Sequence, residues 1–217
     1  MNEVVAWSSL ALSIVMLIAY EWRAHYLGRH KPDLFARSAN AQVRVQWVWA
    51  LSEKPGYEIV AVQALRNSLM SATISASTAA LAVMGVMSIT GVKLAAELPR
   101  LALDGGMQLR LVLEAGLVLI LFASYICSAM SMRHFGHASF VMSMPVDAPQ
   151  RAALNPVAAH HVRLAGVLYS WGLRLFLMAA PMVSGIVHAL AMPVVTALLL
   201  VALYFFDRPA DSYRIST

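Results

Sequence analysis

Long stretches with few or no charged residues follow one another along this chain. They cover residues 4–20, 67–90, 111–132, 164–187 and 189–206. A helix needs about 20 apolar residues to cross roughly 30 Å of hydrocarbon, and about 17 is the lower limit. Helices also satisfy their backbone hydrogen bonds without water. The pattern therefore predicts an all-α fold, a polytopic helical membrane bundle, with five transmembrane helices in a single membrane domain, 1–217.

The boundary between the last two stretches leaves the number of crossings open. The last two stretches are separated only by His188, Ala189 and the region of Pro193, so they could form a bent pair and give four crossings.

Residues 34–54 contain a stripe of Val43, Trp47 and Ala50 at helical spacing. A helix of this kind is typical of a membrane surface, so we expect a cytoplasmic interfacial helix there.

Composition agrees with a membrane environment. The chain of 217 residues is 60% hydrophobic and only 12% charged, whereas an average soluble domain is about 25% charged. The net charge of +5 needs no nucleic acid as a partner, because no recognition motif accompanies it. The lipid bilayer is the partner that the composition requires.

The basic residues predict an orientation, because cytoplasmic loops carry an excess of Lys and Arg. Three basic residues fall in the loop between the second and third stretches, whereas the other loops and the C-terminal tail hold twelve. The three are Lys93, Arg100 and Arg110, and the twelve are Arg23, Arg29, Lys31, Arg37, Arg44, Lys54, Arg66, Arg133, Arg151, Arg163, Arg208 and Arg214. We expect an N-terminus outside and a C-terminus in the cytoplasm, in the cell membrane (the bacterial inner membrane).

The second stretch is unusually rich in Ser, Thr and Ala. Ser68, Ser71, Ala72, Ser75, Ala79 and Ala82 share one face at helical spacing. Small residues let helices approach closely in lipid, so the stretch predicts a close-packed inner helix. The alternative is a helix whose hydroxyls line a hydrated path.

Polar residues inside or beside the stretches are candidates for a polar conduit or an anion site. Arg174 lies about ten residues into the fourth stretch, which predicts a position close to mid-bilayer, where a charge is costly and faces the bundle interior. A contact between Glu114 and Arg174 is geometrically possible. The full candidate set is Arg66, Asn67, Ser71, Ser75, Arg174 and Glu114.

Histidines gather in the loops predicted to be cytoplasmic. His134 and His137 are three residues apart and share a helical face, and His160 or His161, or Glu21 with His25, could complete a metal site. Two histidines at this spacing chelate a metal if a third ligand joins them. The candidate metal ligands are His134, His137, His160 and His161.

Several segments together resemble the membrane family known as domain of unknown function 599, found in bacteria and plants. They read AYEWRAHYLGRH, AVQALRNSLMSATISASTAAL, MRHFGHASFVMSMP, LYSWGLRLFLMAAP and ALYFFD. The resemblance implies a helical membrane protein of four or five crossings. It implies no substrate and no catalytic residue.

The sequence favours a small channel or transporter, a homo-oligomer that moves an ion or a small polar, possibly anionic, solute. One alternative is a non-catalytic accessory or structural subunit of a larger membrane complex. Another is a metal binder at the cytoplasmic face. No nucleophile–base–acid set, P-loop or Gly-rich dinucleotide turn is present, so we expect no enzymatic activity, and the sequence requires no cofactor.

Overall fold

A computed structural model describes residues 3–30, 36–104 and 109–208. These residues form α-helices joined by short connections, and no strand occurs among them. The helices, in chain order, are α1 (Glu3–His30), α2 (Ala36–Ser52), α3 (Glu58–Asp104), α4 (Leu109–Met142), α5 (Pro149–Leu177), α6 (Ala179–Val187) and α7 (Ala191–Asp207). The predicted all-α membrane bundle is confirmed.

Four segments of the described chain are long and apolar enough to cross a membrane: residues 3–26, 58–92, 109–142 and 149–187. α7 is a shorter apolar helix of 17 residues. A turn at His188–Leu190 separates it from α6, so α7 runs back beside α1 instead of continuing the preceding helix. The last two apolar stretches are therefore two separate helices.

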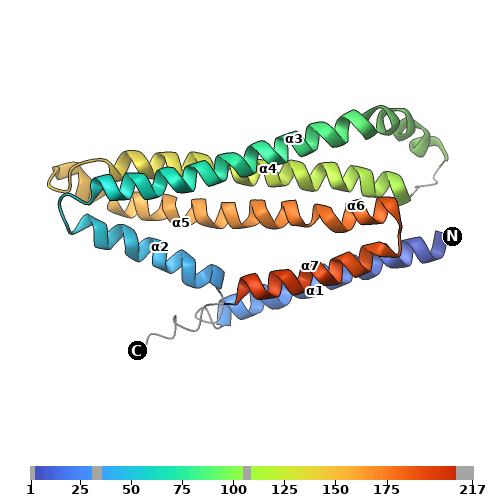
Figure 1. Ribbon diagram of the computed structural model, residues 1–217, viewed down its shortest axis with the longest axis horizontal. Coiled ribbons are helices and arrows are strands. Elements are labelled where there is room, and N and C mark those ends of the chain that lie inside the picture. Colours follow the sequence, from blue (N-terminus) through green and yellow to red (C-terminus); the bar gives the residue numbers. More distant parts are fainter. Residues whose placement is uncertain (1–2, 31–35, 105–108, 209–217) are drawn as a thin grey trace.

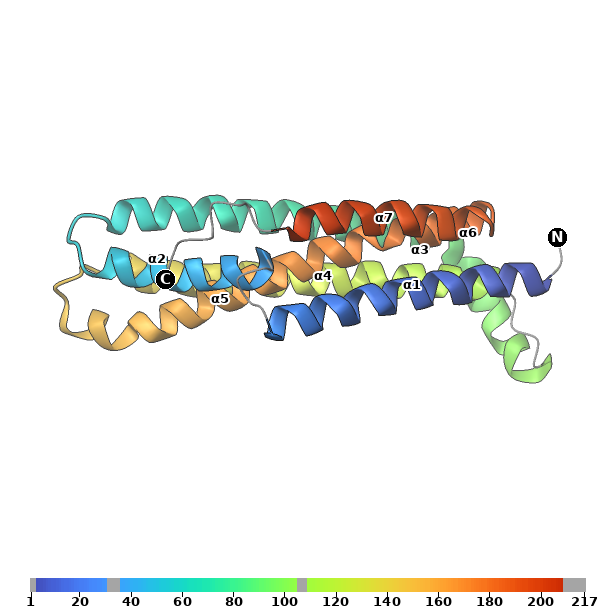
Figure 2. The same cartoon turned by 90° about the horizontal axis from the view of Figure 1, so that it is seen from below.

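α4 and α5 pack along most of their length and form the centre of an elongated bundle (Figure 1). α3 packs on α4, and the pair of α1 and α7 lies on the opposite side of α4 and α5 (Figure 1). Figure 2 shows that α1 and α7 cover only the half of the bundle that holds the N-terminus, whereas α2 covers the other half. We call these halves the α7 half and the α2 half.

Small residues allow the close approach of α4 and α5. Ser124, Ser128 and Ser131 are buried on one face of α4. The Ser124 hydroxyl donates to the Gly172 carbonyl at 2.7 Å, and the Ser131 hydroxyl donates to the Ala165 carbonyl at 2.8 Å. The hydroxyls thus bond across the helix pair, which compensates for the weak hydrophobic force between helices in lipid.

The close-packed face predicted for residues 67–90 is present in part. Ala72, Ala76 and Ala79 of α3 are buried, whereas Ser71 is exposed. Three exposed hydroxyls of α3, those of Ser71, Thr73 and Thr78, donate to carbonyls of their own helix four residues earlier. Because these hydroxyls are satisfied internally, alanine makes the close contact and the hydroxyls point outward.

The predicted amphipathic helix is present as α2. It packs lengthwise on α5, with Val48 fully buried and Arg44 and Trp47 half-buried, whereas Val43 and Ala50 are exposed. The stripe of Val43, Trp47 and Ala50 is therefore not the face that packs on α5, and its contact with a membrane surface stays a prediction. The buried face follows Arg44, Val48 and Leu51, because α5 offers a groove of small residues at Ala158, Ala165 and Gly166.

Candidate functional site

A buried ionic cluster joins three helices in the middle of the bundle. The Arg174 guanidinium on α5 bonds to Glu21 of α1, with Nη1 and Oε1 2.8 Å apart, and forms an ion pair with Asp207 of α7. The Tyr20 hydroxyl donates to Asp207 Oδ2 at 2.7 Å. We call Tyr20, Glu21, Arg174 and Asp207 the Arg174 cluster. It ties α1 and α7 to α5.

The lengths of α1 and α7 give the place of the Arg174 cluster along the bundle. Glu21 lies about 27 Å along α1 from Glu3, and Asp207 lies about 24 Å along α7 from Ala191, at 1.5 Å per residue. A hydrocarbon core of about 30 Å that began at those helix ends would reach its opposite boundary near the cluster. The mid-bilayer position of Arg174 stays a prediction.

The contact considered between Glu114 and Arg174 does not form. Glu114 is buried near the start of α4 and pairs with Arg110 one turn earlier, with Nε and Oε1 2.9 Å apart. Arg174 instead bonds to Glu21, in the second half of α1, and to Asp207, the last residue of α7, which lie at its own level. A guanidinium that forms two ion pairs has no need of a third anion.

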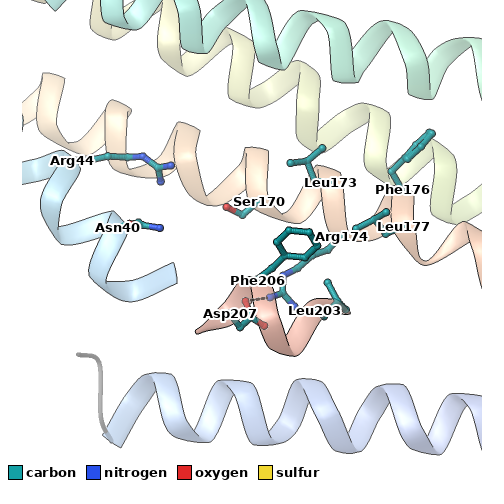
Figure 3. A pocket seen from close by; sticks show the side chains of 10 residues that line it. All are labelled: Asn40, Arg44, Ser170, Leu173, Arg174, Phe176, Leu177, Leu203, Phe206 and Asp207. Atoms are coloured by element: carbon teal, nitrogen blue, oxygen red, sulfur yellow. Dashed lines mark hydrogen bonds and ion pairs between the residues drawn. The ribbon is translucent and has the colours of Figure 1, made fainter. Parts of the chain in front are cut away.

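A cavity of about 320 Å³ lies beside the Arg174 cluster, between α2, α5 and α7. Its polar lining includes Asn40, Arg44 and Ser170, and the remaining lining is formed by Leu173, Arg174, Phe176, Leu177, Leu203, Phe206 and Asp207. Figure 3 shows Arg44 reaching from α2 toward α5, on the side of the cavity away from the Arg174–Asp207 pair. We call this space the Arg44 cavity.

Within the part of the chain that the structure describes, Arg44 is a cation without a counter-charge. Its half-buried guanidinium lies against Gly166, where any added side-chain carbon would overlap it. Among the described residues, no acceptor or carboxylate bonds to it. Burial lowers the pKa of the Arg44 guanidinium from its usual range, but a guanidinium remains charged at neutral pH. The cavity therefore holds one positive charge that an anionic ligand would balance.

The residues predicted for the conduit do not gather at this cavity. Arg66, Asn67 and Ser71 are exposed on α3 and Ser75 is half-buried there. α3 lies across the bundle from α1 and α7 (Figure 1). Of the predicted set, only Arg174 lines the Arg44 cavity.

The predicted histidines do come together, between α4 and α5 in the α2 half. The Nδ1 atoms of His134 and His161 are 2.8 Å apart, and the ring centroids of His137 and His161 are 5.4 Å apart. His160 lies beside His161, with ring centroids 5.9 Å apart. Within the described residues, however, no three potential ligands are arranged to hold a metal ion, so a metal site there stays a prediction.

Sequence reasoning missed the roles of Tyr20, Glu21, Asp207 and Arg44. A signal for the two carboxylates is present, since Glu21 directly follows the first apolar stretch and Asp207 directly follows the last. Stretches on neighbouring helices that end at the same membrane boundary bring such residues to one level. Arg44 gives no comparable signal, because its isolation depends on the packing of α2 against Gly166.

The Tyr20 hydroxyl should contribute measurably to the cluster. We expect Tyr20→Phe to lower the free energy of unfolding by about 1.5 kcal/mol, because a hydrogen bond to a charged acceptor is lost while the ring is kept. Denaturant unfolding in detergent, followed by circular dichroism, measures the change. Tyr125→Phe is the control, since Tyr125 is exposed and its ring contacts Phe122. Equal losses in the two variants would show that the Tyr20–Asp207 bond contributes nothing.

Membrane-length apolar helices, with exposed apolar side chains around a polar centre, define a polytopic helical membrane protein. The family model described as "Protein of unknown function, DUF599" matches residues 8–212, and the chain belongs to this family. The resemblance noted in the sequence is thereby confirmed. Neither the curated proteins nor the solved structures include a match to the chain.

Proposed function

We propose that this protein is a membrane transport protein for an anionic solute and that the Arg44 cavity is its binding site. The observation that carries the proposal is the Arg44 guanidinium, which faces a cavity of about 320 Å³ and has no carboxylate partner among residues 3–30, 36–104 and 109–208. Ligand pockets begin at roughly this size. Cations within or beside a bilayer normally pair with another group or mark the path of a solute.

The Arg174 cluster supplies a second element of the proposal, a barrier at the inner wall of the cavity. Arg174 and Asp207 both line the cavity and pair with each other. A solute that moved deeper into the bundle would have to separate them. An anion is suited to this, because it can replace Asp207 as a partner of Arg174 at little electrostatic cost.

The predicted orientation fits this arrangement. The α2 half would project into the cytoplasm, and the Arg44 cavity would lie where that half meets the membrane. The homo-oligomer expected from the sequence could use the exposed face of α3, which lies across the bundle from α1 and α7 (Figure 1). Within one chain, the candidate path runs along α5 and α7, away from that face of α3.

Flux through proteoliposomes tests the proposal. Purified protein is reconstituted and screened for uptake of labelled small anions, including inorganic phosphate, carboxylates and sulfate. We expect Arg44→Gln to reduce uptake at least about tenfold, because loss of one charged partner of an anion costs 2 kcal/mol or more. Arg163→Gln is the matched control, since Arg163 is exposed on α5 and does not line the cavity. Equal uptake by wild type and Arg44→Gln would refute the proposal.

A further inference from the structure

We infer that the ligand of the Arg44 cavity is an anionic phospholipid, held by its phosphate at Arg44 with its acyl chains left in the bilayer. This deepens the proposed function and rests on it in taking the cavity as the binding site. The observations that favour a lipid over a small soluble anion are the division of the lining into two parts, the size of the cavity and the place where it opens.

The two ends of the lining differ. Asn40, Arg44 and Ser170 lie toward the α2 half, as Figure 3 shows for the side chains of α2. At the other end, apolar side chains such as Leu177 and Phe206 surround the Arg174–Asp207 pair, whose two charges neutralise each other. A small inorganic anion gains nothing from apolar walls, whereas an amphiphile uses both parts of such a cavity.

The cavity opens sideways, toward the surface that lipid would cover. Phe206 is 73% exposed, and Leu173 and Leu177 are 39% and 40% exposed. These side chains surround the cavity and continue onto the apolar outer surface of the bundle. Because about 320 Å³ is at the lower end of the range for ligand pockets, it holds a head group, and the acyl chains would extend past these residues into the membrane.

Charge and hydrogen-bond capacity point to a head group with a phosphodiester. Arg44 supplies several N–H donors in a planar fork, which matches two oxygens of a phosphate. The Ser170 hydroxyl already donates to the Gly166 carbonyl at 2.9 Å, so its oxygen is left to accept. A glycerol head group could donate to it, whereas a choline group has no hydrogen to give.

The level of the cavity agrees with this ligand. Figure 3 shows Arg44 further toward the α2 half than the Arg174–Asp207 pair. A hydrocarbon core of about 30 Å that began at the first residues of α1 and α7 would end near that pair. Phosphates of one leaflet occupy this level. In the predicted orientation it is the cytoplasmic leaflet, whose anionic lipids attract basic groups.

Lipid retention by the full chain tests the inference. Delipidated protein in detergent is incubated with phosphatidylglycerol, phosphatidylcholine, glycerol phosphate or inorganic phosphate, and bound molecules are counted by native mass spectrometry. We expect wild type and Arg163→Gln to retain phosphatidylglycerol selectively, and Arg44→Gln to retain at least about tenfold less. Gly166→Ala keeps the charge but displaces the guanidinium, so it should also reduce retention. Alanine favours a helix over glycine, and circular dichroism verifies that each variant is folded.

The other outcomes separate the two proposals. Equal retention of phosphatidylglycerol by wild type and Arg44→Gln, or equal retention of phosphatidylcholine, would overturn the lipid inference. Binding of inorganic phosphate or glycerol phosphate without lipid would also overturn it, while leaving a soluble anion as the transported solute. Arg44-dependent lipid retention in a protein that moves neither small anions nor labelled phosphatidylglycerol across a vesicle membrane would uphold the inference and refute transport.

Discussion

Arg174→Leu should lower the free energy of unfolding by about 3–5 kcal/mol, the cost of removing one partner of a buried ionic group. The guanidinium is 7% exposed, and its partners Glu21 and Asp207 are 24% and 10% exposed. Without Arg174, two carboxylates would face each other with little water. Denaturant unfolding in detergent, followed by circular dichroism, measures the loss.

Matched variants show whether charge or packing causes this loss. Arg163→Leu removes an exposed guanidinium from the same helix and should change stability by less than about 0.5 kcal/mol. Adding Glu21→Gln and Asp207→Asn to Arg174→Leu neutralises both carboxylates and should recover most of the stability, because an amide is much cheaper to bury than an unpaired charge. A triple variant as unstable as Arg174→Leu alone would mean that the ion pairs are not the cause.

The loss should be structural as well as energetic, because α1 has few other contacts. It packs mainly on α7. Near the N-terminal end, Leu10 joins Leu113 and Met192 in an apolar cluster, and the Arg174 cluster is the attachment at the other end. We therefore expect proteolysis of Arg174→Leu to begin in the connection between α1 and α2.

The sequence predicted the membrane environment and the number of apolar helices, because both follow from apolar stretches that are long enough to cross a membrane. It placed the ends of the helices poorly. α3, α4 and α5 each continue beyond their apolar stretch into the α2 half, since a helix that leaves the membrane continues while its neighbours still cover it. Charge-free runs mark the lipid-facing part of a helix, and so they underestimated the lengths of these three helices.

The candidate site was harder to predict, for a different reason. Arg174 stood out because a charge interrupts an apolar run, but its partners lie 153 and 33 residues away in the chain. Choosing them over Glu114 required the relative levels of α1, α5 and α7, which local spacing does not give. Arg44 has the opposite problem. In the sequence it is one of many loop arginines. Only the folded structure shows that no described carboxylate pairs with it.

The small-residue signal was correct in part. The Ser and Ala content of residues 67–90 predicted close packing of α3, and its alanines Ala72, Ala76 and Ala79 are buried. The hydroxyls that join helices are those of Ser124 and Ser131 on α4, which bond to the carbonyls of Gly172 and Ala165 on α5. Gly172 lies in a run of bulky residues and gives little signal in the sequence.

Gly172→Leu should therefore be the most disruptive single change in the α4–α5 interface. A Cβ at this position would lie 3.3 Å from both the Ser124 carbonyl oxygen and the Ser128 backbone nitrogen, and closer still to the Ser128 hydroxyl. Backbone atoms cannot rotate away as a side chain does, so α4 and α5 must separate. We expect a loss at the upper end of the roughly 1–3 kcal/mol typical of overpacking, measured by the same unfolding experiment.

Three further variants identify the cause. Gly136→Leu is the control, because nothing lies within 4 Å of a Cβ added at Gly136, and the change should be neutral or stabilising through helix propensity. Gly172→Ala should cost less than Gly172→Leu, and Ser128→Gly in the same chain should relieve part of its cost by removing the nearest atom. The relief should be incomplete, because the Ser124 carbonyl and the Ser128 backbone remain in place. If Gly172→Leu is as stable as Gly136→Leu, α4 and α5 do not approach each other at Gly172, and the hydrogen bond from Ser124 to its carbonyl cannot be what joins them.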